Sequence, residues 1–143
     1  MNEAAGDIKN RKRRGEWAEL RFMAEAAQRG LSVSKPWGES DRYDVGVEHN
    51  GHYQRVQVKS TLYRIKAYYR CNLKTWNRNN PYRPGEVDFF AIYIIPEDLW
   101  YIVPAAVALA IKGKNIGFTP HLKGHKYECY QKAWHLLSGP EPV

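Results

Sequence analysis

The sequence predicts an α/β domain in which a mixed sheet is flanked by helices, and three observations lead to this class. The chain opens with an amphipathic helical pattern at residues 13–29, continues with two alternating segments joined by Asn50-Gly51, and later contains a near-continuous apolar run at residues 87–95. In that order, these patterns are typical of a surface helix, of a β-hairpin and of a strand buried on both faces.

Length and composition limit how the chain can be organised. Its 143 residues suffice for one domain with one core and are too few for two ordinary domains. We therefore expect a single domain over residues 1–143, with residues 1–9 as a mobile tail. The two cysteines have no zinc-site spacing, and neither a membrane-spanning stretch nor a secretion signal is evident, so the expected location is the cytoplasm.

The charge balance favours a polyanionic partner. Lys and Arg number 22 against 15 Asp and Glu, which gives a formal net charge of +7. Such a balance is typical of proteins that bind nucleic acid, although a basic protein with no such partner has the same composition. Part of the charge forms a run at residues 9–14, which is either a solvated helix start or an arm that contacts DNA through Arg13 and Arg14.

The predicted helix over residues 13–29 has an apolar stripe and a defined end. Gly30 supplies the stop, because glycine readily adopts the left-handed conformation that follows a helix. The residues of the stripe recur at spacings of three and four, and they are Trp17, Leu20, Ala24, Ala27 and Leu31.

Two glutamates lie on the side of this stripe, Glu16 within it and Glu19 at its edge. A carboxylate in such a position loses hydration unless it has a partner. Ion pairs with Arg13 or Arg21, or the favourable interaction of an acidic residue with the helix N-terminus, are sufficient to explain the position of Glu16. For Glu19, these explanations and a role in a functional site are equally supported.

A hairpin is the most informative part of the sequence. Asn50-Gly51, between the expected strands 42–49 and 52–60, is the strongest short signal for a two-residue hairpin turn. A turn of this length fixes the register, so that His49 faces His52. The hairpin is preceded by an expected short strand at residues 31–35 and a loop at residues 36–41.

This register gathers three polar side chains on one face of the hairpin, opposite a mainly apolar face. Asp44 lies directly across from Gln57, and Lys59 is a diagonal neighbour within reach. An acid, an amide and an ammonium therefore converge. The alternative is an ordinary solvated strand face with an Asp–Lys ion pair. The valines around Gln57 and Lys59, together with the inward-leaning Glu19, favour an embedded functional site.

Basic and aromatic residues follow the hairpin. We expect residues 61–73 to form one alternating strand with basic residues on one side, and residues 75–86 to form a polar loop. Basic residues interleaved with aromatics suit contacts with DNA phosphates, and the alternative is a strand with one solvated face. The candidates for DNA contact are Arg13, Arg14, Arg64, Lys66, Arg70, Lys74, Arg78 and Arg83.

The remaining elements are expected to complete the sheet and its helical cover. The apolar run at residues 87–95 is the best candidate for a central strand, entered through Asp88, and residues 100–104 are expected as its antiparallel neighbour. Residues 105–112 and 127–137 are expected as two helices, the second with a core-facing stripe at helical spacing.

The order of these residues resembles the PD-(D/E)XK nuclease superfamily. Gly15 and Glu19 lie on an opening helix, Asp44 comes next, and the run 57–59 (QVK) lies on the second strand of a hairpin. The stretches RYDVGVE, RVQVKST and VDFFAIYIIPEDLWYIVP resemble the branch that includes group I intron homing endonucleases and relatives of archaeal Holliday-junction resolvases. The resemblance extends over residues 12–105.

This resemblance implies a restriction-endonuclease-like αβββαβ core and hydrolysis of DNA phosphodiester bonds with Mg²⁺ or Mn²⁺. In this sequence Asp44 is then the principal metal ligand, and Glu19 is a further ligand or a carboxylate that orients the attacking water. Lys59 stabilises the charge that develops on the phosphate or positions the water. Because one copy of such an enzyme cuts one strand, we expect a homodimer or higher homo-oligomer that acts on duplex or branched DNA.

Two positions depart from the superfamily pattern. Tyr43 stands where a proline is expected before Asp44, at a loosely defined motif position. Gln57 stands where Asp or Glu is usual, and an amide oxygen binds a hard cation without contributing charge. The homing-endonuclease branch resembles this sequence in tolerating Gln here, so an active endonuclease is the leading hypothesis. The alternatives are a catalytically silent DNA-binding module of the same fold, with Gln57 as the cause, and a structural or partner-binding protein.

Overall fold

The computed structural model describes residues 8–38, 40–75 and 80–139, so residues 1–7 of the expected tail and the candidate Arg78 lie outside the described part. The helices and strands, in chain order, are α1 (Arg11–Gln28), β1 (Ser32–Ser34), β2 (Val45–His49), β3 (His52–Thr61), β4 (Arg64–Ile65), β5 (Tyr68–Asn72), β6 (Phe89–Ile94), β7 (Leu99–Pro104), α2 (Ala105–Leu109) and β8 (Asn115–Phe118).

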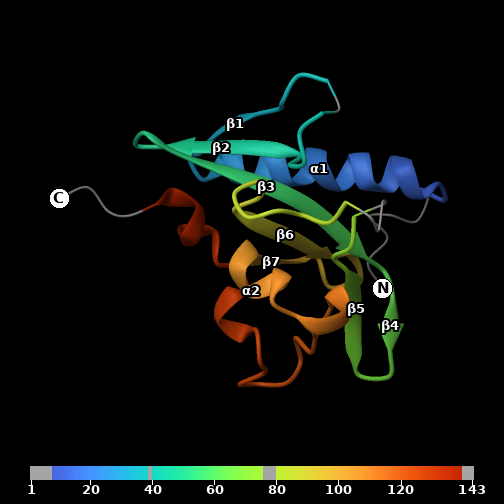
Figure 1. Ribbon diagram of the computed structural model, residues 1–143. Coiled ribbons are helices and arrows are strands. Elements are labelled where there is room, and N and C mark those ends of the chain that lie inside the picture. Colours follow the sequence, from blue (N-terminus) through green and yellow to red (C-terminus); the bar gives the residue numbers. More distant parts are fainter. Residues whose placement is uncertain (1–7, 39, 76–79, 140–143) are drawn as a thin grey trace.

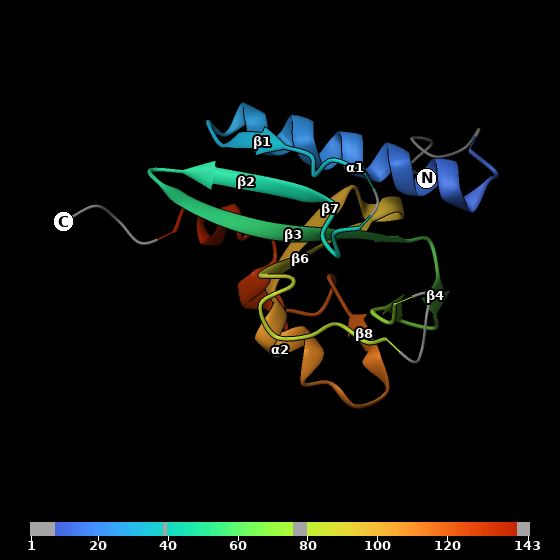
Figure 2. The ribbon, with the colours of Figure 1, turned by 45° about the horizontal axis from the view of Figure 1, so that its top comes forward.

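These elements form three layers. The central layer is a five-stranded sheet in the order β1-β2-β3-β6-β7, and α1 crosses one of its faces (Figure 1). A three-stranded sheet in the order β4-β5-β8 and the short α2 lie on the opposite side (Figure 2). Only the β3–β6 pair is parallel, so the sheet is mixed and the predicted α/β class is confirmed.

The opening helix forms where the sequence predicts it and ends as predicted. The side-chain oxygen of Asn10 caps it by accepting a hydrogen bond of 3.1 Å from the backbone N–H of Arg13. At the other end Gly30 adopts a φ of 84°, and the N–H of Leu31 returns to the carbonyl of Ala26 at 3.2 Å.

The predicted apolar stripe of this helix is wrong along most of its length. Leu20 is 63% exposed, and Ala24 and Ala27 are also exposed. The buried row is instead Ala18, Phe22 and Ala26, at spacings of four. Rotation of the helix to this row buries the phenyl ring of Phe22 between tryptophans, which removes more apolar surface from water than burial of Leu20 would. The same rotation leaves Glu16 exposed.

The hairpin has the predicted register. Asn50 and Gly51 adopt φ values of 51° and 81°, and His49 pairs with His52. The pairs Val45–Val56 and Val47–Gln54 follow, and these three valines pack with the buried face of α1 in one core. Because side chains alternate along a strand, the residues between the valines of β3 point to the other side of the sheet.

Strand β6 is an interior strand, as the sequence predicts, and β7 is its antiparallel neighbour. Its side chains from Phe90 to Ile94 are fully buried. Asp88 enters this strand as a structural residue, because its carboxylate accepts hydrogen bonds from the backbone N–H of Arg55 at 2.7 Å and from the Nε of the same residue at 3.0 Å.

The predicted single strand over residues 61–73 is wrong, because the chain reverses within it. Lys66 adopts a φ of 52°, and Ile65 pairs with Tyr68, so that β4 and β5 form a second hairpin. Apolar residues of β5 and β8 then pack against the sheet face opposite α1, in a second core. The expected αβββαβ core has a helix between its third and fourth strands. In the described residues of the crossover from β3 to β6 (62–75 and 80–88), this hairpin and a loop stand in its place.

The predicted helix over residues 127–137 is also wrong. This segment contains two 3-10 turns, Glu128–Tyr130 and Trp134–Ser138, separated by Lys132 at a φ of 54°. The N–H of Lys132 donates instead to the carbonyl of Trp100 in β7, at 2.8 Å. Tertiary pairing thus replaces the helical pattern, although the apolar residues are core residues as expected. No helix in the described residues is long and apolar enough to cross a membrane.

Candidate active site

Asp44 is fixed to the hairpin by both its backbone and its side chain. Its N–H donates to the carbonyl of Val56 at 2.9 Å, which extends the ladder one residue beyond β2. Its carboxylate oxygen Oδ2 accepts a hydrogen bond of 2.9 Å from the backbone N–H of Val58. The acid is therefore held over β3 between Gln57 and Lys59, as the register predicts.

Gln57 supplies a polar atom that lacks a protein partner. Its side-chain oxygen Oε1 is buried and has no hydrogen-bond partner within the described part of the chain. A buried carbonyl oxygen without a partner costs free energy unless a ligand or water satisfies it. Because Gln57 faces away from the core under α1, this oxygen is available on the face that carries Asp44 and Lys59.

Lys59 is half-buried beside the acid. Its ammonium nitrogen Nζ donates to the backbone carbonyl of Lys74, at a long 3.4 Å. The pKa of Lys59 is lowered overall. Burial is the main cause, and the neighbouring Cys71 and Asp44 offset it only in part. A partly desolvated ammonium at this position is suited to bind an anionic ligand in place of solvent.

Glu19 forms an ion pair that the sequence did not indicate, and its charge influences Asp44. Its carboxylate contacts the ammonium of Lys35 at 2.5 Å, and not Arg13 or Arg21. Burial, followed by the negative charge of Glu19, raises the pKa of Asp44 to about 6; the Val58 N–H and the two lysine ammoniums act in the opposite direction. Two carboxylates thus lie close enough to repel one another.

The residue types fit a hard divalent cation. A group of three or more His, Cys, Asp or Glu side chains that could hold a metal is absent from the described ranges. Two carboxylates and one amide oxygen, with waters to complete the shell, are nevertheless a suitable ligand set for Mg²⁺. The unpartnered Gln57 oxygen and the raised pKa of Asp44 are the two features that such a cation would relieve.

Several of the predicted DNA-contacting residues gather next to this site. Arg14 and Arg70 border two adjoining hollows beyond Lys59, around Ser60 and Thr61, together with the unpredicted Arg11. Arg70 also lies over the ring of Tyr63 at 5.1 Å. Lys74 adjoins the site through its carbonyl, whereas Arg64 and Lys66 lie farther along the β4–β5 hairpin; Arg13 and Arg83 are exposed.

The chain belongs to the PD-(D/E)XK endonuclease family, whose model matches residues 9–137. Among solved structures it is similar to a bacterial homing endonuclease, I-Ssp6803I, with 27% sequence identity, a TM-score of 0.76 and coverage of 92% of this chain and 93% of that chain. A search of curated proteins found no match. These findings confirm the predicted superfamily and identify the chain as a homing-endonuclease-like nuclease, which implies DNA as its partner.

Proposed function

We propose that this protein is a Mg²⁺- or Mn²⁺-dependent endonuclease that hydrolyses phosphodiester bonds in duplex or branched DNA, with Asp44, Gln57, Lys59 and Glu19 as its active site. The observation that carries the proposal is the buried, unpartnered oxygen of Gln57 beside the carboxylate of Asp44, in a chain of this family. Both atoms are held by one hairpin, so their relative positions do not depend on flexible loops.

Each residue has a role that follows from its environment. Asp44 and the Gln57 oxygen would hold the cation, with Glu19 as a further ligand or as the group that orients the attacking water. Lys59 would place its ammonium against the phosphate, where negative charge increases during hydrolysis. A bound divalent cation supplies charge neutralisation at the phosphate and a more acidic water. One such site serves one strand, so we propose that a homodimer or higher homo-oligomer cuts duplex DNA.

Nicking of supercoiled plasmid tests this function. We expect the wild-type protein to nick plasmid with Mg²⁺ or Mn²⁺ and to be inactive in EDTA. Asp44→Ala and Lys59→Ala are expected to lower the rate at least about 100-fold, as for the loss of one charge-stabilising group in a preorganised site. Asp41→Ala, at an exposed carboxylate of the loop before β2, is the control for a lost acid. Cleavage that survives both site substitutions would contradict the site assignment.

The catalytically silent DNA-binding module is the second candidate, because Gln57 contributes no charge to the metal. A wild-type protein that does not nick plasmid but keeps salt-sensitive DNA binding would favour this second candidate. Gln57→Glu tests the ligand itself: it is expected to tighten Mn²⁺ binding, measured by calorimetry, because a carboxylate binds a hard cation more strongly than an amide. Gln54→Glu makes the same change at the paired position of Val47 and is expected to leave Mn²⁺ binding unchanged. A folded Gln57→Glu variant with wild-type Mn²⁺ affinity would count against Gln57 as a ligand.

A further inference from the structure

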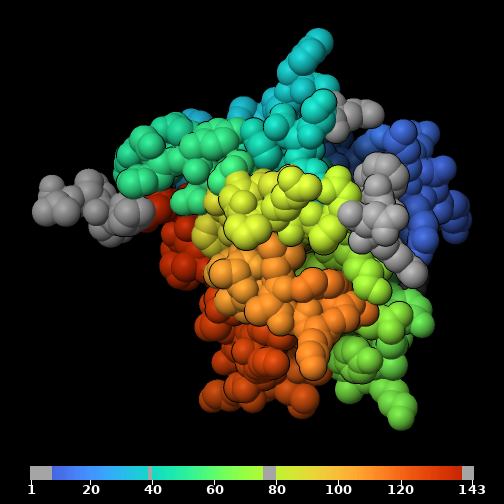
Figure 3. Space-filling view, viewed as in Figure 1, coloured from blue at the N-terminus to red at the C-terminus, as the bar shows by residue number. Residues whose placement is uncertain are grey.

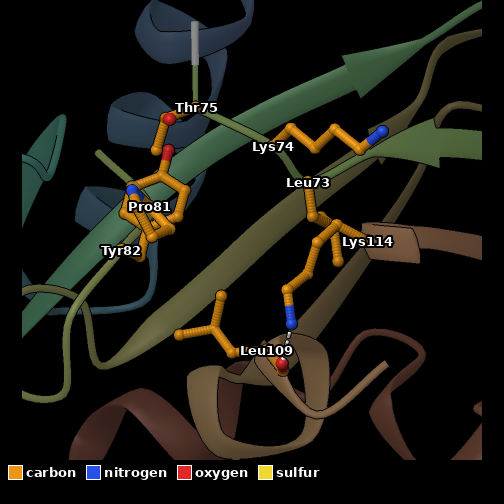
Figure 4. Close-up of a pocket in the computed structure, with 7 residues that line it drawn as sticks. All are labelled: Leu73, Lys74, Thr75, Pro81, Tyr82, Leu109 and Lys114. Atoms are coloured by element: carbon orange, nitrogen blue, oxygen red, sulfur yellow. Dashed lines mark hydrogen bonds between the residues drawn. The ribbon is translucent and has the colours of Figure 1, made fainter. Parts of the chain in front are cut away.

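A pocket of about 520 Å³ adjoins the proposed active site, and Figure 4 shows its lining. Its apolar walls come from Leu73, Pro81, Tyr82 and Leu109, and Lys74, Thr75 and Lys114 complete the lining. Leu73, Leu109 and Tyr82 belong to the second core, on the sheet face opposite α1. Gln57 and Lys59 point to the same side, because they alternate with valines of the first core.

One lining residue accepts a hydrogen bond from the proposed active site, and a second lies within the electrostatic influence of Asp44. The carbonyl of Lys74 accepts the hydrogen bond from the ammonium of Lys59 at 3.4 Å. Burial and, next, the charge of Asp44 raise the pKa of the Tyr82 phenol to about 12, so this hydroxyl stays neutral and lies near the carboxylate. The pocket therefore begins where the proposed metal and phosphate sites end.

The walls are held in place by packing. The ring of Tyr82 lies edge-on to Phe90 at 5.5 Å, and the guanidinium of Arg42 lies over it at 5.1 Å. Arg42 is itself fixed by a hydrogen bond of 2.6 Å to the carbonyl of Asn80. Lys114 donates to the carbonyl of Leu109 at the base of the pocket, while the Lys74 side chain extends away from it (Figure 4). The pocket is thus largely formed before any ligand binds.

The ligand that suits this pocket is planar, mainly apolar on its faces and attached to an anionic chain. Its volume lies in the range of small-molecule sites and exceeds what a single heteroaromatic ring system needs. The apolar walls favour burial of such a ring, and the outward ammonium of Lys74 favours the phosphates on either side of it. Nucleic acid offers this combination in a base that has left its stack.

We propose that the pocket receives an unpaired nucleobase of the bound DNA, from a nucleotide next to the phosphate that is cut. This proposal rests on the proposed function only in placing that phosphate at Lys59. It deepens that function, since a protein that accommodates an unstacked base prefers DNA whose pairing is interrupted or easily opened. Branched or distorted DNA would then be bound more tightly than a uniform duplex.

Binding of two matched short duplexes tests the proposal without requiring cleavage. One is fully paired, and in the other a single 2-aminopurine faces an abasic site, so that its base is already unpaired. Each duplex is titrated with protein in EDTA at constant salt. The anisotropy of a terminal dye measures binding, and the emission of 2-aminopurine reports on the stacking of the unpaired base. We expect the wild-type protein to bind the interrupted duplex about tenfold more tightly and to change the 2-aminopurine emission, as stacking of one base is sufficient for this effect.

Filling the pocket is expected to remove the preference. Leu109→Trp places an indole inside it, and binding of the two duplexes should then become equal. Leu122→Trp makes the same change at a residue that is 58% exposed and not in the lining, and it should keep the tenfold preference. Should Leu109→Trp fail to fold by circular dichroism, Pro81→Trp at the exposed rim replaces it.

The possible outcomes are distinct. A wild-type protein that binds both duplexes equally, or a folded pocket variant that keeps the preference, overturns the proposal. A change in oligomeric state of Leu109→Trp, with no preference in the wild type, would assign the pocket to a second copy of the chain. Because the assay uses EDTA, a failure of the pocket proposal leaves metal-dependent nicking intact, and absent nicking leaves base binding measurable.

Discussion

At the scale of single residues, Asp44 has the least favourable environment of the proposed site. Burial and the nearby Glu19 raise its pKa to about 6 from an ordinary value of 3.8. The free energy spent on keeping this carboxylate ionised is a stability cost in the metal-free protein. A site built in this way binds a cation more tightly than solvated carboxylates do, since the cation removes the repulsion.

Asp44→Asn is therefore expected to stabilise the metal-free protein at pH values above the raised pKa. The folded wild-type protein binds its proton more tightly than the unfolded chain does, so its stability falls as the pH rises from the ordinary pKa to the raised one. The gain should be on the order of 3 kcal/mol above this window and should vanish below it. Urea unfolding in EDTA, below pH 3.8 and above pH 6, measures both limits.

The matched control is Asp41→Asn, at an exposed carboxylate of the loop before β2. It should leave the free energy of unfolding within about 0.5 kcal/mol of the wild type at both pH limits. If Asp44→Asn stabilises the protein equally at the two limits, then the effect does not come from ionisation, and the account of Asp44 as a repelled carboxylate is wrong.

At the scale of elements, α1 begins with a charge pattern that opposes its own stability. Four cationic residues, Arg11 to Arg14, occupy its first turn, and no acidic residue accompanies them. The partial positive charge at a helix N-terminus disfavours cations there. Arg11 and Arg14 also border the hollows beside Lys59. A destabilising cluster next to the proposed site supports a role in holding DNA phosphates.

Arg14→Glu is expected to raise stability and weaken DNA binding together. The carboxylate interacts favourably with the helix N-terminus, so the free energy of unfolding should rise by about 0.5 kcal/mol. Loss of a phosphate contact should reduce the slope of log K against log salt by about 1. Lys123→Glu, an equal charge change in an exposed C-terminal loop, is the control. An equal loss of slope in both variants would make the effect one of net charge alone.

The elements also show which sequence patterns determine structure locally. Asn50-Gly51 fixed the hairpin register, because the turn geometry allows only one pairing, and three members of the site followed from it. The patterns at residues 61–73 and 127–137 failed where single residues, Lys66 and Lys132, adopt positive φ to satisfy distant pairing. Periodicity carries no information about such long-range contacts.

The site was predicted to the extent that it is local in the chain. Asp44, Gln57 and Lys59 lie on one hairpin and could be placed together from its register. Lys35, which pairs with Glu19, comes from the loop after β1, and the sequence placed it only as the last residue of an expected strand. The hydrogen bond from Lys59 to the carbonyl of Lys74 depends on how the crossover folds back over the sheet, which no spacing rule specifies.

At the scale of the whole molecule, the C-terminal segment closes the core under α1. Trp134 is only 7% exposed; its ring stacks with Phe22 at 5.5 Å and meets Trp100 edge-on at 5.9 Å. Arg29 lies over its other side at 4.4 Å. A residue near the end of the chain therefore ties α1 to the central sheet, and it supports the position of Glu19 on that helix.

Trp134→Ala is expected to destabilise the protein by about 3–5 kcal/mol, the usual cost of removing a buried indole. Trp37→Ala removes the same side chain from a loop where it is 97% exposed, and it should change the free energy of unfolding by less than about 0.5 kcal/mol. Chemical denaturation followed by circular dichroism measures both. Comparable losses in the two variants would show that Trp134 does not support the core as described.

The order of the elements along the chain puts the proposed hydrolytic residues directly ahead of the crossover. These residues end with Lys59, and the crossover up to β6 then supplies the β4–β5 hairpin and the loop of residues 80–88, which lies against the segment 105–118 in Figure 3. Buried side chains of β5 belong to the second core, and the carbonyl of Lys74 accepts a hydrogen bond from Lys59. A change in the length of β5 would therefore disturb the second core and the proposed site together, so we expect insertions to be tolerated mainly at the exposed loop positions of this crossover.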